Sequence, residues 1–442
     1  MKYPTKEQVY TGKNQISKRV THVTILDSVT SIGLYAFEEC TGLTSIILPN
    51  SVTSIGYKAF YNCTALTSIT IPDSVISIGH NAFEECTSLT SIVIPDSVTS
   101  IRDGAFRECT SLTSITIPPT VKSIGKSAFY NCTALTSIIL PNSVKSIGYY
   151  AFRECTSITS IVIPPKVTSI GEHVFTGCTA LTSIILPNSV KSIGNNAFIQ
   201  CTCLTSITIP DSVTSIGHCA FNGCTSLTSI VIPPKVTSIG ELAFSGCTSL
   251  TTITIPDSVK SIGQYAFRQC TGLTSITIPD SVTSIGEDAF YDCASLTSIV
   301  TKSVTWIGKY AFYMCTGLTT IVIPDSVTSI GKFAFACTGL TSITIPNSVE
   351  SIEKNAFAGC TNIQAITAPP RFLNLTIFPD TKEEVIHRLT PDQRRYASIA
   401  LRNLPEDVTR YVVFNFIEGP SNKQPNKPHD HGVTTIGDRV FM

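Results

Sequence analysis

The chain lacks several features that would place it at a membrane or on nucleic acid. It has no apolar run of about 18 residues, the length that a membrane-spanning helix needs. Its first residues, MKYPTKEQVYTGKNQISKRV, lack the apolar stretch of about 7–15 residues of a secretory signal. Neither sign of charge is in excess, because 31 Lys and Arg face 31 Asp and Glu. These absences predict a cytoplasmic protein with no membrane span and no attraction to nucleic acid. Export by a route that needs no such signal stays open as the alternative.

The chain also lacks the motifs of common enzyme classes. It contains no Gly-rich phosphate loop, no nucleophile elbow and no HExxH. Glu84 and Glu85 are neighbours in the sequence, so they cannot face each other across a cleft. His80 and His218 are six repeats apart, roughly 30 Å at the spacing of β-strands. We therefore predict no enzymatic activity, no cofactor and no metal site.

A phenylalanine recurs every 23 residues from Phe37 to Phe290, and two single-residue slips carry the series on through Phe312, Phe335 and Phe357. Fifteen copies of one unit result. A fixed period in this range is typical of solenoids, because each unit buries its apolar face only by stacking on the next.

Residues 66–88, LTSITIPDSVISIGHNAFEECTS, represent the unit. Alternation around Ile69 predicts a β-strand with that side chain inward and Ser68 and Thr70 outward. Pro72 ends the strand, since it cannot donate a ladder hydrogen bond. The sequence predicts a second short extended piece over 75–78 and a helical or 3₁₀ turn at Ala82-Phe83.

Fifteen of the 17 cysteines occur once per repeat, and Cys203 and Cys219 are extra. This spacing predicts a buried ladder of reduced thiols and no disulfide framework. One slip lies at Phe335-Ala336-Cys337, which has one spacer residue where other copies have two. Glycine follows the isoleucine that ends the second extended piece in thirteen copies. Arg102 and Glu353 take its place in the other two. Either a positive φ is not required there, or these two copies are strained.

Four regions are predicted along the chain. Residues 1–19 form an N-terminal cap, with a capping box at 5–8 that suggests a short helix. Residues 20–366 form the solenoid. Residues 367–418 form a helical C-terminal cap or a small module, with helices after the capping box at 381–384 and over 390–403 and an ambiguous apolar piece at 408–417. Residues 419–442 combine a flexible linker with a partial repeat.

The recurring pattern IPxSVxxIGxxAFxxC, over roughly residues 20–366, resembles a leucine-rich repeat of the BspA-like type. The resemblance implies an α/β repeat solenoid of about 15 repeats. This would be a curved stack with a parallel sheet on one face and short strands and helical turns on the other. Members of that family are often surface or adhesion proteins, and the implied activity is protein binding.

Specific recognition requires positions at which the copies differ, and these surround the phenylalanine. We predict a monomeric interaction scaffold that binds a protein partner of unknown identity there. The alternative is a structural or surface protein, for adhesion or even ice binding, that uses the regular Ser/Thr/Val sheet face. A duplicated array with no selected partner also stays open. The candidate partner-binding residues are Tyr57, Lys58, Tyr61, Arg107, Tyr149, Tyr150, Arg153, Tyr265, Arg268, Tyr310 and Tyr313.

Overall fold

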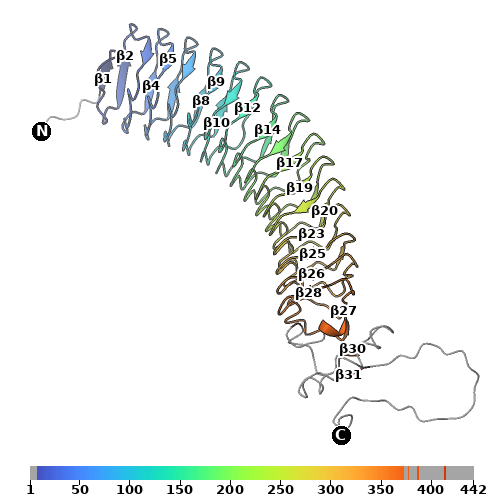
Figure 1. The fold of residues 1–442 in the computed structure, drawn as a ribbon. Helices are drawn as coiled ribbons and strands as arrows, with labels where there is room; N and C mark the ends of the chain where they lie inside the picture. Colours follow the sequence, from blue (N-terminus) through green and yellow to red (C-terminus); the bar gives the residue numbers. More distant parts are fainter. Residues whose placement is uncertain (1–6, 373–376, 378–385, 388–412, 415–442) are drawn as a thin grey trace, which may run out of the picture. The chain divides into compact units, whose positions relative to one another are not determined.

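The computed structural model describes residues 7–372, 377, 386–387 and 413–414. The chain divides into two compact units, Met1–Ser258 and Val259–Met442. Each unit is a parallel β-solenoid, in which short strands of successive copies lie side by side (Figure 1).

In the first unit, most copies contribute a three-residue strand followed by a two-residue strand, and each kind pairs with its own kind in the next copy. The first ladder contains β2 (His22–Ile25), β4 (Ser45–Ile47), β6 (Ser68–Thr70), β8 (Ser91–Val93), β10 (Ser114–Thr116), β13 (Ser160–Val162), β15 (Ser183–Ile185), β18 (Ser229–Val231) and β20 (Thr252–Thr254). The second contains β3 (Ser31–Ile32), β5 (Ser54–Ile55), β7 (Ser77–Ile78), β9 (Ser100–Ile101), β11 (Ser123–Ile124), β12 (Ser146–Ile147), β14 (Ser169–Ile170), β16 (Ser192–Ile193), β17 (Ser215–Ile216) and β19 (Ser238–Ile239).

The second unit repeats this arrangement over the remaining copies. Its three-residue strands are β22 (Ser275–Thr277), β24 (Ser298–Val300), β27 (Ser342–Thr344) and β29 (Ala365–Thr367). Its two-residue strands are β21 (Ser261–Ile262), β23 (Ser284–Ile285), β25 (Trp306–Ile307), β26 (Ser329–Ile330) and β28 (Ser351–Ile352).

The predicted alternation of the first strand is confirmed. Ile69 is buried, whereas Ser68 and Thr70 are exposed, and Ile69 pairs in register with Ile46 of the preceding copy. Beyond Pro72, the Ser74 hydroxyl donates to the Val52 carbonyl at 2.6 Å, so the turn itself is bonded to the preceding copy.

The recurring phenylalanines form one continuous column inside each unit. In the first unit, from Phe37 to Phe244, adjacent rings are nearly parallel, with centroids 5.1 Å to 5.6 Å apart. From Phe267 to Phe357 the separations are 5.3 Å to 5.4 Å. Because every ring is buried and contacts the ring of the next copy, the column fixes the register of the stack.

The predicted helical turn at the phenylalanine is wrong. Lys58 and Asn62, which flank Phe60, have φ of 52° and 57°, and the matching positions of other copies are left-handed as well. The N–H groups of Lys58, Phe60 and Asn62 donate to carbonyls of the next copy at 3.0 Å, 2.8 Å and 2.8 Å. These donors are therefore unavailable to a helix. Among the described residues, the one helical element is a 3₁₀ turn, η1 (Pro370–Phe372), so the α/β part of the predicted fold class is not supported.

Close approach between copies, and not a positive φ, explains the recurring glycine after the second strand. A Cβ on Gly79 would lie 2.5 Å from the carbonyl carbon of Gly56, in the preceding copy. Arg102 and Glu353, which replace this glycine twice, are not among the residues with positive φ. The left-handed strain considered for those two copies is therefore absent.

The N-terminal segment is a strand where a short helix was predicted. β1 (Glu7–Tyr10) pairs in parallel with β2, with Tyr10 opposite Ile25. The buried Tyr10 ring lies 5.0 Å from the Phe37 ring and extends the aromatic column by one place. Its hydroxyl accepts a hydrogen bond from the Gly33 N–H at 3.2 Å. Strand pairing satisfies backbone groups that the first repeat would otherwise leave open, which a helix would not do.

At the other end, two short strands continue the ladder. β30 (Ile386–His387) pairs with β29, and β31 (Val413–Phe414) pairs with β30. The helix predicted after 381–384 is therefore wrong at Ile386–His387, and the ambiguous piece at 408–417 contains a strand. The helix predicted over 390–403 and the linker and partial repeat of 419–442 lie outside the described residues.

The predicted thiol ladder is present. The ladder cysteines are buried and reduced. Cys40, in the first copy, donates to the Ser17 carbonyl, and cysteines of later copies donate to the phenylalanine carbonyl of the preceding copy. Cys63, for example, donates to Phe37 at 3.1 Å. Burial removes the thiolate from water and raises the pKa of Cys155 and of Cys247 to about 12.

The prediction of one ladder cysteine in every copy fails at the slip. Cys337 is only partly buried and has a φ of 57°, as Asn62 has. Thr338 takes the ladder position instead: it is 4% exposed, and its hydroxyl donates to the Phe335 carbonyl at 2.8 Å. The copy keeps the normal spacing from phenylalanine to the ladder and lacks one residue afterwards, where Gly339 leads directly to the buried Leu340.

Removing one ring from the column should open a cavity that the rigid stack cannot close. We expect Phe152→Ala to lower the free energy of unfolding by about 3–5 kcal/mol and to separate unfolding into two transitions. Urea denaturation followed by circular dichroism measures both effects. Val93→Thr, at an exposed position that is Thr in neighbouring copies, is the matched control. A loss below about 1 kcal/mol for Phe152→Ala would contradict the account.

Burial of the thiols also predicts a pH dependence. The unfolded thiol has a pKa of about 8.5, so above this pH the unfolded chain loses protons that the native chain keeps. Stability should therefore fall as pH rises, by up to about 1.4 kcal/mol per pH unit for each buried thiol, until the pH approaches the native pKa. Cys155→Ala should lose one thiol's share of this slope. Urea denaturation of the wild type and of Cys155→Ala at neutral and alkaline pH measures this difference. Equal slopes of the unfolding free energy against pH would contradict the role of the buried Cys155 thiol.

Candidate functional site

Variable side chains line the turn that holds each buried phenylalanine, and we call this row the turn ridge. In each copy it comprises the two residues after the glycine of the second strand and the two residues after the phenylalanine. In the copy of Phe60 these are Tyr57, Lys58, Tyr61 and Asn62. Because the backbone is bonded from copy to copy here, matching positions lie about one strand spacing apart, ~5 Å. Their side chains can therefore contact each other.

The ridge carries all of the predicted partner-binding residues and brings most of them into three clusters. The first contains Tyr57, Lys58 and Tyr61. The Lys58 ammonium lies 4.1 Å from the Tyr61 ring centroid and 5.9 Å from that of Tyr57. The Tyr61 hydroxyl donates to Glu85 at 3.1 Å. Partial burial, together with this bond, raises the pKa of the Tyr61 phenol.

The second cluster combines the predicted Arg107, Tyr150 and Arg153 with Tyr130. The Arg107 guanidinium lies 5.2 Å from the Tyr130 ring centroid, and that of Arg153 lies 5.7 Å from Tyr130 and 5.8 Å from Tyr150. Tyr150 also stacks on His173 at 4.8 Å. Burial, and then the nearby Arg153 charge, lower the pKa of His173, which favours its neutral form.

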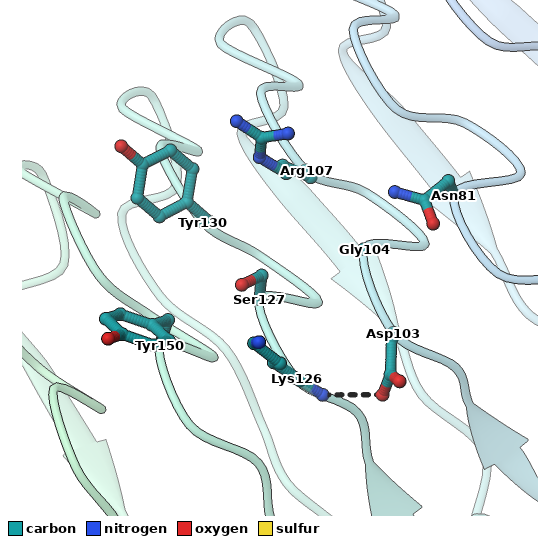
Figure 2. A pocket seen from close by; sticks show the side chains of 8 residues that line it. All are labelled: Asn81, Asp103, Gly104, Arg107, Lys126, Ser127, Tyr130 and Tyr150. Atoms are coloured by element: carbon teal, nitrogen blue, oxygen red, sulfur yellow. Dashed lines mark hydrogen bonds between the residues drawn. The ribbon is translucent and has the colours of Figure 1, made fainter.

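An open surface hollow of about 370 Å³ lies over this cluster (Figure 2). Arg107, Tyr130, Ser127 and Tyr150 border it on one side, and Asn81 and Asp103 border it on the other. The Lys126 N–H donates to Asp103 at 2.8 Å. The hollow offers ring faces, hydroxyls and cations at one place, which suits a protruding side chain of a protein partner.

The third cluster, in the second unit, contains Tyr265, Arg268, Tyr310 and Tyr313 with Tyr291. The Arg268 guanidinium lies 4.6 Å from the Tyr291 centroid and 5.7 Å from that of Tyr265. Tyr313 lies 5.1 Å from Tyr291 and 5.4 Å from Tyr310. These side chains border a second open hollow, of about 360 Å³.

Tyr149 does not join its predicted neighbours. It is 55% exposed, and its ring lies against Gly171 of the next copy, where a Cβ would come within 2.9 Å of it. The sequence reasoning also missed Tyr130, Tyr291 and Phe333. Tyr130 and Tyr291 share the repeat position of Tyr61, and Phe333 shares that of Tyr310, on which it stacks at 5.1 Å. An alignment of the copies by position would have found them.

The sheet face presents a different surface. Threonines just before the strands bond the preceding copy, as Thr67 does by donating to the Thr44 carbonyl at 3.0 Å, whereas the strands themselves carry exposed hydroxyl side chains such as Ser68 and Thr70. The outermost column contains both Thr and exposed apolar residues, such as Ile47 and Val93, which are 73% and 65% exposed. This face therefore offers a flat surface of hydroxyls and β-branched side chains.

Within the described residues, no three His, Cys, Asp or Glu side chains gather where they could hold a metal ion. The same residues include no helix long and apolar enough to cross a membrane.

The stacked parallel strands and the buried phenylalanine turn define a leucine-rich-repeat-type solenoid. A family model for the BspA type leucine-rich repeat region matches residues 15–132, 76–205, 191–305 and 299–380. The chain belongs to this family, as the repeat pattern predicts.

A solved structure of high similarity supports the fold. A leucine-rich repeat protein from Bacteroides ovatus is 35% identical, with 78% of this chain and 92% of that chain covered and a TM-score of 0.73. One from T. pallidum is 36% identical, with 36% and 77% covered and a TM-score of 0.35. A leucine-rich cell surface protein from Faecalibacterium prausnitzii is 32% identical, with 66% and 89% covered and a TM-score of 0.37. Comparison with curated proteins gave no match.

One ridge residue should matter for stability more than for recognition. Arg107 bonds Glu84, which is 3% exposed, at 2.6 Å, and Glu108 at 2.7 Å. We expect Arg107→Ala to cost about 1–3 kcal/mol, because it leaves the buried Glu84 carboxylate with less compensation. Arg268→Ala removes ring contacts of the same kind and should cost about 1 kcal/mol or less. Urea denaturation compares the two, and equal losses would contradict a structural role for Arg107.

Proposed function

We propose that this chain is a non-enzymatic interaction scaffold that binds a protein partner on the turn ridge. The observation that supports this most directly is the gathering of Tyr, Arg and Lys into clusters at the positions where the copies differ. Tyr and Arg are the side chains most often found at the energetic centre of protein interfaces. A stack that is nearly the same in every copy and presents a row that varies from copy to copy is suited to recognition.

The clusters are also ordered before any partner arrives. Arg268 lies against two rings, and Tyr61 is hydrogen-bonded to Glu85. Side chains held in this way lose less conformational entropy on binding than free ones. The ridge therefore presents ring faces and cations with little further loss of conformational entropy. This favours specific binding of one protein partner over weak, nonspecific association.

The second candidate is a structural or surface role for the sheet face. It is favoured by the exposed β-branched column, in which Ile139 is 84% and Val322 is 78% exposed. Against ice binding stands the interruption of the outermost Thr column by exposed Val and Ile, such as Val93 and Ile139. The cytoplasmic location and the monomeric state stay predictions.

A pull-down from native cell extract with the full chain separates the two candidates. The ridge variant takes residues that other copies carry at the same positions: Tyr61→Asn, Tyr150→Asn, Tyr265→Asn, Tyr310→Asn and Tyr313→Ala. Asn tolerates the left-handed backbone at 150, 265 and 310 better than Tyr does, so the fold should be kept. The matched sheet variant is Val93→Thr, Val231→Thr and Val322→Thr, again with residues from other copies.

We expect a protein that the wild type captures to be lost from the ridge variant and kept by the sheet variant. The reverse result would move the function to the sheet face and support the structural or surface role. Retention by both variants, or capture of nothing by the wild type, would contradict the scaffold proposal. Circular dichroism spectra of all three proteins verify that the fold is intact.

A further inference from the structure

The chain has no net charge, but one segment of the first unit is strongly basic. Residues 109–210 contain six Lys and Arg against two Glu, a difference of 6 − 2 = 4 positive charges. The two acidic residues, Glu154 and Glu172, lie on the turn ridge. Four of the lysines lie elsewhere, at the corner between the first and second strand ladders. This lysine row consists of Lys122, Lys145, Lys166 and Lys191.

The row runs across four consecutive copies. The Lys145 N–H donates to the Lys122 carbonyl at 2.8 Å, so these two residues are direct neighbours, just before the paired strands β11 and β12. The Lys191 N–H donates to the Thr168 carbonyl at 2.8 Å, and Lys166 lies two residues before Thr168. All four lysines are exposed, and none forms an ion pair with another described residue.

Acidic residues border the row and are missing from it. The turn after the first strand carries Asp73 and Asp96 in the two copies before the row and Asp211 in the copy after it. Within the row the same position is occupied by Pro119, Asn142, Pro165 and Asn188. The lysine row therefore lies between copies that carry an Asp at this turn, and Lys235 and Lys260 occupy the same two repeat positions beyond Asp211.

An apolar strip accompanies the lysine row on the adjoining sheet face. Ile139, Val162 and Ile185 are 84%, 61% and 63% exposed, and Val162 pairs in register with Ile185. The flanking copies have Thr116 and Thr208 at this position. Elsewhere in the first unit, apolar residues and threonines alternate at this position, so three consecutive apolar residues occur just where the lysines do.

We propose that the lysine row and this apolar strip form a second docking surface, for an acidic amphipathic segment of a protein partner. Such a segment alternates carboxylates with apolar side chains. Its apolar groups would cover the strip, and its carboxylates would face the lysines, which steer the encounter and fix the register. This surface goes beyond the turn ridge and lies on other faces of the stack.

Other anionic partners fit the surface less well. A planar lipid surface that reached the row would also meet Asp96 and Asp211 at its two ends. Single-stranded nucleic acid is usually held by aromatic stacking as well as by charge, and the row contains lysines alone. Lysines act as point charges without the paired geometry that arginine offers to phosphate. Separate carboxylates spaced along a peptide suit them better.

The test uses the full chain and substitutions that other copies already carry. The lysine variant is Lys122→Thr, Lys145→Thr, Lys166→Ser and Lys191→Thr. The apolar variant is Ile139→Thr, Val162→Thr and Ile185→Thr. Ser at 166 supplies the hydroxyl that Ser143 and Ser189 use to bond the preceding copy, so the fold is kept. A charge-matched control removes four lysines from other places: Lys235→Ser, Lys260→Thr, Lys332→Asn and Lys354→Asn.

The probe is a short fluorescein-labelled peptide in which Glu alternates with Val, and fluorescence anisotropy measures its binding. We expect the lysine variant and the apolar variant each to bind about tenfold more weakly than the wild type. The control and the ridge variant should bind as the wild type does. Binding should also weaken as salt is added. A peptide in which Gln replaces Glu, and one in which Ser replaces Val, should both bind more weakly than the parent.

Three results would overturn the proposal. Equal binding by the wild type and the lysine variant would remove the row from the surface. Equal binding of the Glu/Ser and Glu/Val peptides would show a general attraction to polyanions. Binding of phosphatidylserine vesicles or polyphosphate without binding of the Glu/Val peptide would assign the row to lipid or phosphate. The ridge variant is measured with the same peptide. Failure of the lysine-row proposal can therefore be distinguished from failure of the proposed function of the turn ridge.

Discussion

The structure depends on hydrogen bonds that leave each phenylalanine turn for the next copy. Around Phe60, alternate N–H groups donate to carbonyls one copy further on, and the residues on either side adopt left-handed φ to aim them there. A left-handed residue such as Lys58 costs energy by itself. Here the cost is offset because the left-handed turn forms hydrogen bonds with the next copy and places its phenylalanine ring against the ring of that copy. Strand pairing, burial of the thiols and the close approach at Gly79 all require the copies to be stacked in this register.

The same register explains how surface features arise in this protein. Since each repeat position forms a column, a side chain meets the residue at its own position in the neighbouring copies. Similar or complementary residues in consecutive copies therefore make a surface patch, and isolated ones do not. Arg268 and Tyr291 form a cluster in this way, and Lys122 and Lys145 are direct neighbours for the same reason. Tyr149 stays single because Glu172 follows it in the next copy.

Much of the candidate site could be predicted, because position in the repeat implies position in space. The clusters of Lys58 and of Arg268 were expected from their variable positions. Tyr130 and Phe333 were not predicted, because what identifies them is the set of residues at their own repeat position and not their neighbours in the sequence. The anchoring of Arg107 by the buried Glu84 could not be predicted either. This ion pair depends on the burial of the Glu84 side chain, and the repeat pattern does not predict that burial.

The sequence alone determined the period, the strands with inward Ile69, and the burial of the phenylalanine and cysteine columns. These follow from apolar spacing, which is the same in nearly every copy. Only the tertiary structure decided the left-handed turn, the placing of Thr338 and not Cys337 in the ladder, and the pairing of β1 and β30 as strands. Each of these is set by backbone donors and acceptors of a neighbouring copy. Those partners are distant in the sequence, so local residue preferences at Lys58, Cys337 or Glu7 do not report them.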